Sequence, residues 1–250
     1  MRYLGGKYRI ADKLSPVIAD YLEDKDLYWE PFLGAGWVAY ELAIELERRS
    51  MLDSVKLYAS DIEPNLMALH KALQDGSVTL PANLSREQWQ ALKLETKPSA
   101  LRAFAGYGCS FGGMFFKSYA KSDSKRNYAS NAKHSIERVA RKVSLFNLHT
   151  IDFNDPGLDS GELLDTLQAG KAVIYCDPPY NNTAGYQVKF NRQEFIENCL
   201  ILSDYGNTVL VSEYMINHDR FKVIKEIKSK TDIRSTMGTD RTERLYRVTK

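Results

Sequence analysis

The chain has 250 residues, of which 44% are hydrophobic and 26% charged, and its formal net charge is +2. This length suits one large α/β domain or a domain that carries an insert. No apolar run approaches the roughly 20 residues that span a membrane, and the N-terminus lacks the apolar core of a signal peptide. Three cysteines without paired spacing argue against a disulfide framework or a structural zinc site. We therefore expect a cytoplasmic protein, and the net charge alone identifies no nucleic-acid partner.

The first 76 residues alternate predicted helices and strands. Their order is typical of a parallel sheet with crossover connections. A proline at position 16 could divide the first helix. The predicted helices, taken from the 3.6-residue spacing of apolar residues, are Tyr8–Leu22, Trp37–Arg49 and Glu63–Leu73, and the predicted strands are Leu27–Trp29 and Val55–Ser60.

The pattern changes between residues 77 and 145. Ser85-Arg86-Glu87-Gln88 has the form of a capping box that starts a short helix. Residues Ala105–Gly113 are rich in glycine, and a further helix is expected at His134–Leu145. This composition differs from sheet core, so we expect a main domain formed by residues 1–76 and 146–250, with an inserted, mainly helical lobe at 77–145.

Strand-like segments resume after the insert. Asn191 offers a helix start before Phe195–Leu202. The segment Asp232–Thr249 has the pattern of an antiparallel hairpin that turns at Met237–Asp240. The predicted strands of this region are Leu148–Ile151, Ala172–Cys176 and Thr208–Ser212.

Asp177-Pro178-Pro179-Tyr180 is the most informative short motif. It directly follows the strand Ala172–Cys176, and two prolines end a strand because they fix φ and remove backbone donors. The stiff corner lies at the carboxyl end of a strand, where open α/β sheets bind ligands. Asp177 and the Pro178 carbonyl can accept hydrogen bonds from an amino group, and Tyr180 can stack on a flat heterocycle. The motif therefore suits the exocyclic amine of a nucleobase, although an ordinary surface turn is an alternative interpretation of the same four residues.

A second motif, Gly34-x-Gly36-x-x-Ala39, lies between a predicted strand and a predicted helix. Small residues there allow a tight turn and close approach of a ligand. Asp61 ends the next strand and could hold two ribose hydroxyls, or could cap the helix that follows. By itself this pattern also fits a nicotinamide cofactor.

Three departures favour S-adenosylmethionine (AdoMet) over a dinucleotide. Glu30 precedes the turn and would repel a pyrophosphate, whereas AdoMet carries a sulfonium and an ammonium. The chain opens with a segment that contains Gly5, Gly6 and Lys7 and could hold the methionine carboxylate of AdoMet. Alternatively, Lys7 is an ordinary lysine exposed to solvent. Asp177 lies in the same predicted sheet.

Taken in order, these motifs resemble the Dam-type DNA adenine-N6 methyltransferases of phages and bacteria. The resemblance extends over nearly the whole chain, and it implies a Rossmann-like, AdoMet-dependent methyltransferase sheet with a C-terminal antiparallel hairpin. It also implies the site residues. Asp177, Pro178, Pro179 and Tyr180 would bind the target base, and the cofactor would be bound by Tyr3, Lys7, Glu30, Phe32, Gly34, Gly36, Asp61, Asp152, Phe153 and Asp177.

The insert is basic and interleaved with aromatic residues between positions 107 and 142. Lysine and arginine contact phosphates, while aromatic rings stack on bases or wedge between them. Any one of these residues could equally belong to a solvated helix face. The resemblance places DNA recognition in this lobe, with expected contacts from Lys117, Lys121, Lys125, Arg126 and Lys133. The chain lacks a clear match to the recognition hairpin of the enzymes that methylate GATC, so its recognition sequence stays open.

The implied reaction is methyl transfer from AdoMet to adenine N6 in double-stranded DNA after base flipping. It needs no covalent nucleophile, and the four histidines show no metal-ligand spacing, so we expect no metal. A monomer is the default, because one flipped base needs one active site. Alternative hypotheses are a cytosine-N4 or RNA adenine methyltransferase, a nucleic-acid-binding relative without catalysis, and, more distantly, a nicotinamide dehydrogenase. The sequence does not reveal whether a restriction nuclease of a restriction-modification pair accompanies the protein.

Overall fold

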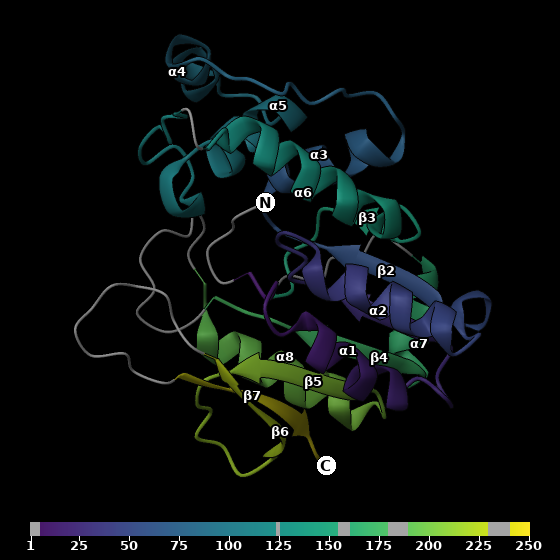
Figure 1. Ribbon diagram of the computed structural model, residues 1–250. Helices are drawn as coiled ribbons and strands as arrows, with labels where there is room; N and C mark the ends of the chain where they lie inside the picture. Colours follow the sequence, from purple (N-terminus) through teal and green to yellow (C-terminus); the bar gives the residue numbers. More distant parts are fainter. Residues whose placement is uncertain (1–5, 124–125, 155–160, 180–189, 230–240) are drawn as a thin grey trace.

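The computed structural model describes residues 6–123, 126–154, 161–179, 190–229 and 241–250. Within these residues the strands form a seven-stranded sheet of order β3-β2-β1-β4-β5-β7-β6 (Figure 1). The first five strands of this order are parallel, while β7 runs antiparallel to both β5 and β6. The strands are β1 (Leu27–Glu30), β2 (Lys56–Ser60), β3 (Asn147–His149), β4 (Ala172–Cys176), β5 (Thr208–Glu213), β6 (Phe221–Ser229) and β7 (Arg241–Val248). The predicted Rossmann-like α/β class with a C-terminal antiparallel hairpin is confirmed.

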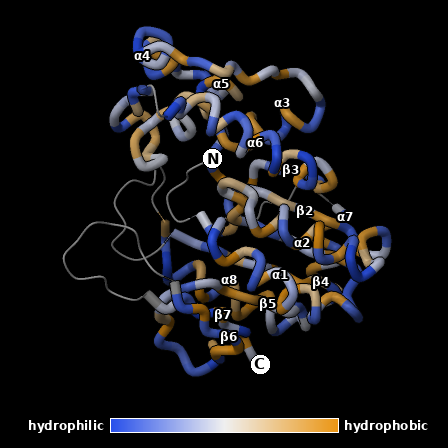
Figure 2. The backbone as a smooth tube through the Cα atoms, viewed as in Figure 1, coloured by the Kyte–Doolittle hydropathy of each residue, from blue (hydrophilic) through white to orange (hydrophobic). Residues whose placement is uncertain are grey.

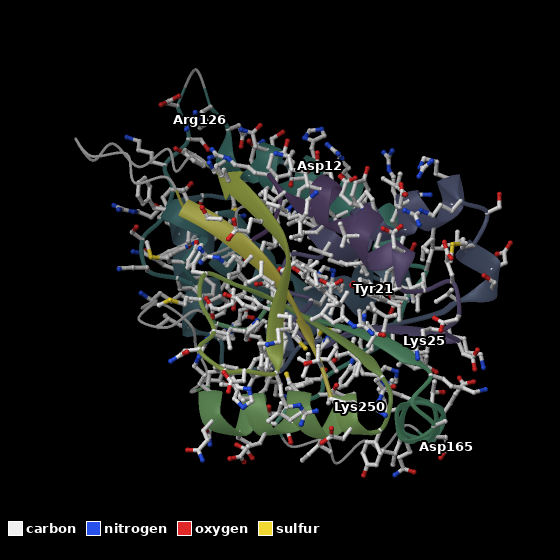
Figure 3. The ribbon with its side chains drawn as sticks, turned by 90° about the horizontal axis from the view of Figure 1, so that it is seen from below. Asp12, Tyr21, Lys25, Arg126, Asp165 and Lys250 are labelled. Atoms are coloured by element: carbon white, nitrogen blue, oxygen red, sulfur yellow. The ribbon has the colours of Figure 1, made fainter. Side chains whose placement is uncertain are left out.

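Helices cover both faces of the sheet. Figure 3 shows α1, which carries Asp12 and ends just before Tyr21, on one side of the strands, and α7, which carries Asp165, and α8 on the other. Each layer has its own hydrophobic cluster against the sheet. The helices are α1 (Ala11–Asp20), α2 (Trp37–Arg48), α3 (Pro64–Gln74), α4 (Arg86–Leu94), α5 (Ala100–Ala103), α6 (Tyr128–Val143), α7 (Gly161–Gln168) and α8 (Arg192–Asp204).

The central strands are buried on both faces, which explains their nearly continuous apolar sequences. All five residues of β4 are buried, and β4 and β5 are mainly hydrophobic in Figure 2. Successive side chains alternate between the faces: Tyr28 and Tyr175 join the cluster of the α1/α2 face, while Trp29 and Ile174 join that of the α7/α8 face. The same alternation directs the polar residues at the strand ends.

The hairpin differs from the prediction in where it begins. Its first strand is Phe221–Ser229, paired with Arg241–Val248, whereas the sequence analysis placed both arms within Asp232–Thr249. Three lysines and a glutamate interrupt the apolar residues of Phe221–Ser229, and such charges are typical of an edge strand that resists further pairing. This charge content obscured the strand in the sequence. The predicted turn at Met237–Asp240 lies outside the described residues.

Two helices also differ from their predicted bounds. α1 continues through Pro16 instead of dividing there. The proline removes one backbone hydrogen bond of the helix, but the helix stays continuous because Leu14 and Ile18, on its buried face, stay packed in the core. α6 begins at Tyr128, with Asn127 accepting a hydrogen bond from the Ser130 N–H at 3.0 Å, and not at His134. α5 and α7 were not predicted.

The segment 77–145 contributes α4, α5, a π-helical turn at Phe104–Gly108 and α6. The predicted capping box of α4 is present, with hydrogen bonds in both directions between Ser85 and Gln88. α4, α5 and α6 lie at the end of the molecule opposite the β6–β7 hairpin (Figure 1). They share one hydrophobic cluster with α1 and α2, and their separation as a recognition lobe stays a proposal. None of the helices in the described part of the chain combines the length and hydropathy that crossing a bilayer requires.

Candidate functional site

The carboxyl ends of three neighbouring strands bring the sequence motifs together. β1 lies between β2 and β4, and the three strands run parallel. Glu30 ends β1, Asp61 follows β2 and Asp177 follows β4, so the three carboxylates share one edge of the sheet. In the sheet, β2 lies on one side of β1 and β4 lies on the other, so the order of the strands reverses at β1. Open α/β sheets bind ligands at such a switch point.

Asp61 ties the glycine-rich turn to the end of β2. Its Oδ2 accepts a hydrogen bond from the Gly34 N–H at 2.8 Å, and its Oδ1 accepts one from the Glu63 N–H at 2.9 Å. Burial raises the pKa of Asp61 to about 6, although these backbone hydrogen bonds act in the opposite direction. A carboxylate has about four acceptor positions, so Asp61 keeps acceptor capacity for a ligand hydroxyl group.

Gly36 ends the turn in a left-handed conformation, with φ of 73°, where it meets α6. A Cβ added there would lie 3.0 Å from Val143 Cγ2 and 3.1 Å from Val139 Cγ1. We expect Gly36→Ala to lower the free energy of unfolding by about 1–3 kcal/mol, because the backbone is strained for alanine and the valines must shift. Urea denaturation measures this change.

Gly76→Ala is the matched control, because Gly76 has the same φ of 73° and nothing within 4 Å of an added Cβ. It isolates the backbone cost, so Gly36→Ala should destabilise the protein more than Gly76→Ala. Equal losses would contradict the close approach of α6 to the turn.

Glu30 is buried at the end of β1, with 2% of its surface exposed. The Tyr28 hydroxyl donates a hydrogen bond to its Oε2 at 2.9 Å. Burial raises the pKa of Glu30 well above its usual value, and the charges of Asp177 and Asp61 raise it further, while the Tyr28 hydrogen bond lowers it. A cation bound next to Glu30 would favour the ionised carboxylate.

Lys7 joins the N-terminal segment to the end of β4. Its Nζ lies 2.5 Å from Asp177 Oδ1 and 3.7 Å from Glu243 Oε1, and only 5% of its side chain is exposed. Burial alone would lower the pKa of Lys7, but the charges of Asp177 and Glu243 outweigh it and raise the pKa. Lys7 is therefore a buried ammonium held by carboxylates, and not the solvated lysine that the sequence also allowed.

Aromatic rings form a wall on the α7/α8 side of the same edge. The Phe32 and Phe153 ring centroids lie 5.4 Å apart, and Phe195 lies 5.8 Å from Phe32 and 5.3 Å from Phe153. Asp152 precedes this wall, and its Oδ1 accepts a hydrogen bond from the Asn154 N–H at 2.9 Å. Such rings can pack against a flat heterocycle.

The chemistry of these groups fits a cationic, hydroxylated ligand such as AdoMet. Glu30, Asp61 and Asp177 would attract a sulfonium and an ammonium and accept hydroxyl hydrogens, whereas they would repel a pyrophosphate. Pro178 is buried and Pro179 half-buried after β4. Tyr3 and Tyr180, which complete the predicted set, lie outside the described residues.

Comparison with known proteins decides the family. The model of the D12 class N6 adenine-specific DNA methyltransferases matches residues 3–155. The chain belongs to this family. It is therefore a methyltransferase, and AdoMet is the methyl donor that the family implies. No curated protein matches the sequence.

Several solved methyltransferase structures are similar at low sequence identity. The rRNA methyltransferase aviRa from Streptomyces viridochromogenes has a TM-score of 0.44 and 15% identity, with 96% of this chain and 84% of that chain covered. A type I restriction-modification methyltransferase subunit from Streptococcus thermophilus has a TM-score of 0.42 and 7% identity, with 96% and 43% covered. Likenesses of this strength carry no argument about the substrate of the D12-class methyltransferase described here.

Within segment 77–145 of the methyltransferase, the predicted DNA-contact residues differ in their surroundings. Lys117, Lys121 and Arg126 are exposed, whereas Lys125 lies outside the described residues. The Lys133 ammonium is engaged within the protein, because it donates a hydrogen bond to the Leu80 carbonyl at 2.7 Å and lies 3.5 Å from Glu137. Lys117, Lys121 and Arg126 are thus better placed than Lys133 for contact with phosphates.

Residues without a functional signal in the sequence connect segment 77–145 to the sheet edge that carries the three carboxylates. Glu63 accepts hydrogen bonds from the Asn65 and Leu66 N–H groups at 3.2 and 2.9 Å. Asn65 Oδ1 accepts one from Arg102 Nη1 at 3.3 Å, and the Arg102 guanidinium lies 5.0 Å from the centre of the Phe115 ring. The Glu63-Pro64 pair signals a helix start, but no local pattern predicts its link to Arg102.

Glu243 was also missed. It lies in β7, 4% exposed, next to the Lys7 ammonium. Arg241 and Arg244 lie close to it in the sequence, and no local pattern distinguishes it from the exposed charges of a surface hairpin. Only the pairing of β7 with β5 brings it to the site.

Proposed function

We propose that this methyltransferase transfers a methyl group from AdoMet to N6 of adenine in duplex DNA. The observation that supports this most is the Asp177-Pro178-Pro179 corner. Asp177 is 18% exposed at the carboxyl end of β4, and its Oδ1 already accepts a nitrogen donor, the Lys7 ammonium, at 2.5 Å. An exocyclic amine is a nitrogen donor of the same kind.

The chain's own residues would hold the cofactor in the proposed site. Asp61 would accept the ribose hydroxyls, Glu30 would lie near the positive charge, and Phe32 and Phe153 would pack on the adenine. Lys7, Asp152, Gly34, Gly36 and Tyr3 belong to the same proposed cofactor set. When bound, AdoMet supplies an activated methyl group. The protein supplies position and electrostatics, which are the main contributions to such a transfer.

The target amine requires activation because its lone pair is delocalised into the purine ring. Asp177 and the Pro178 carbonyl would accept hydrogen bonds from its two N–H groups and so favour a more tetrahedral nitrogen. Tyr180 would stack on the base and align it. The amine lies inside the duplex, so the base must first be flipped out of the helix.

The insert would bind the duplex and stabilise the flipped state. Lys117, Lys121 and Arg126 would contact phosphates, which set the register of the protein on DNA. Phe111 is 60% exposed, on a tight turn in which Gly112 and Gly113 have φ of 68° and 71°. An exposed ring on a tight turn is suited to fill the gap that a flipped base leaves.

Phe111→Ala is expected to lower kcat/KM on duplex DNA by about 10- to 100-fold, because an inserted ring offsets part of the few kcal/mol that unstacking costs. The loss should shrink on a duplex whose target adenine faces an abasic site, since that base is already unpaired. Leu94→Ala is the control, as Leu94 is 82% exposed on α4. An equal loss on both substrates would contradict the wedge.

The proposed function is tested by long-read sequencing of plasmid DNA from an expressing host that lacks adenine methylation. A discrete motif carrying N6-methyladenine would support the proposal and provide the recognition sequence. N4-methylcytosine in the product nucleosides would change the acceptor base. Unmodified DNA, from protein that binds AdoMet in calorimetry, would overturn the DNA-adenine assignment in favour of an RNA or specialised acceptor.

A further inference from the structure

A buried cluster of one cation and two carboxylates lies at the proposed base-binding corner. Lys7 Nζ is 2.5 Å from Asp177 Oδ1 and 3.7 Å from Glu243 Oε1. The Lys7 and Glu243 side chains are each 5% exposed, and that of Asp177 is 18% exposed. Charges this buried interact strongly, because little solvent screens them.

The fold fixes Glu243 at this position independently of Lys7. Arg244 pairs with Glu213, the last residue of β5, so Glu243 lies at the same sheet edge as Asp177. Leu245 belongs to the cluster of the α1/α2 face, and strand alternation directs Glu243 to that face as well. Tyr175 belongs to the same face, so Asp177, two residues further along β4, is directed there too.

Lys7 and the target amine compete for one acceptor. Asp177 Oδ1 receives the ammonium in this structure, and the proposed function needs Asp177 to receive the hydrogen of an exocyclic amine. The ammonium must therefore withdraw when the base enters. A buried ammonium that withdraws without a new partner carries a cost of several kcal/mol.

We propose that Glu243 is a positioning residue that receives the Lys7 ammonium when the base displaces it from Asp177. The difference between 2.5 and 3.7 Å is small enough for a rotation of the flexible lysine side chain to exchange one close partner for the other. The exchange leaves the total charge of the cluster unchanged. It also removes the cation from Asp177, whose carboxylate then becomes a stronger acceptor for the amine. This inference rests on the proposed function and concerns how the same site admits its base.

The test uses Glu243→Gln, which keeps the shape of the side chain and removes its charge. The probe is a duplex with the methylated motif that sequencing provides, in which the target adenine is kept and its neighbouring base is replaced by 2-aminopurine, so that fluorescence reports the unstacking that accompanies base flipping. S-adenosylhomocysteine replaces AdoMet in this assay, so that no methyl group is transferred. We expect the flipping equilibrium to fall by about 10- to 100-fold, the range that one charge-assisted hydrogen bond accounts for. AdoMet affinity, measured by calorimetry, should change less than about twofold.

Two further variants separate positioning from structure. Glu243→Asp keeps the charge and should recover most of the flipping. In the Lys7→Met background no ammonium competes for Asp177, so adding Glu243→Gln should cause no further loss. Glu226→Gln is the matched control, because Glu226 lies in the neighbouring strand β6 and forms an ion pair with Arg244 at 2.8 Å in which its side chain is 54% exposed.

The outcomes are distinguishable. A wild-type protein that leaves the fluorescence unchanged would contradict the proposed function itself. A wild-type response matched by Glu243→Gln would overturn the role of Glu243 alone. Additive losses in the double variant would do the same, because Glu243 would then act independently of Lys7.

Discussion

Asp177→Ala is expected to lower kcat for methyl transfer by about 10²–10³-fold, the loss typical of removing one group that stabilises developing charge. The alanine leaves the target amine without the acceptor that favours a tetrahedral nitrogen, so its lone pair stays delocalised. The Lys7 ammonium keeps Glu243 at 3.7 Å, which limits damage to the fold. Single-turnover incorporation of methyl groups into DNA measures the effect, with circular dichroism as the check on folding.

Asp165→Ala provides the control for this variant. Asp165 is exposed on α7, on the face of the sheet away from Lys7, so its replacement should leave kcat within twofold. An Asp177→Ala protein that is folded and retains kcat within tenfold of wild type would refute the assigned role of Asp177.

AdoMet affinity is expected to fall about tenfold between pH 7 and pH 5, because Asp61 takes up a proton in this range. Burial raises the pKa of Asp61 to about 6, and the protonated group is a weaker acceptor for ribose hydroxyls. The raised pKa of Glu30 acts in the same direction, since a neutral Glu30 no longer attracts the cationic cofactor. Calorimetry across this pH range measures the dependence.

Asp61→Asn separates the contribution of Asp61 from that of Glu30. The amide does not titrate, so the variant should bind AdoMet more weakly at pH 7 and show a flatter pH profile. A variant with the wild-type profile would show that Asp61 does not govern the dependence.

The raised pKa of Asp61 has the opposite effect on the stability of the ligand-free protein, which increases as the pH falls. The folded pKa of Asp61 lies above the unfolded value, so its contribution to stability is fully present below about pH 4 and is lost as the pH rises through about 6. AdoMet binds the ionised form in this proposal, so it should raise Tm more at pH 7 than at pH 5.

Features that depend on neighbouring residues in the chain were predictable. The predicted strand Ala172–Cys176 has the observed bounds, because a short run of apolar residues that ends at two prolines is defined locally. The capping box at Ser85 is formed as expected, since its two hydrogen bonds join residues three apart. The approximate positions of the other parallel strands and of α2 and α3 followed for the same reason.

Features that depend on residues far apart were not predictable. The first hairpin strand, Phe221–Ser229, is marked as a strand by its pairing with β7 rather than by its own composition. Lys133 has the composition of a DNA-contact residue, yet its ammonium donates to the Leu80 carbonyl. A basic residue's availability depends on which acceptors the fold places beside it.

The sequence by itself determined the order of the motifs, the parallel sheet and the resemblance to adenine-N6 methyltransferases, because each rests on spacing along the chain. Only the tertiary structure decided that Lys7, from the N-terminus, meets Asp177 after β4 and Glu243 in β7. The physical reason is that a buried charge requires a partner of opposite charge. These partners meet because β7 and the N-terminal segment pack against one sheet edge, and that packing has no local signature in the sequence.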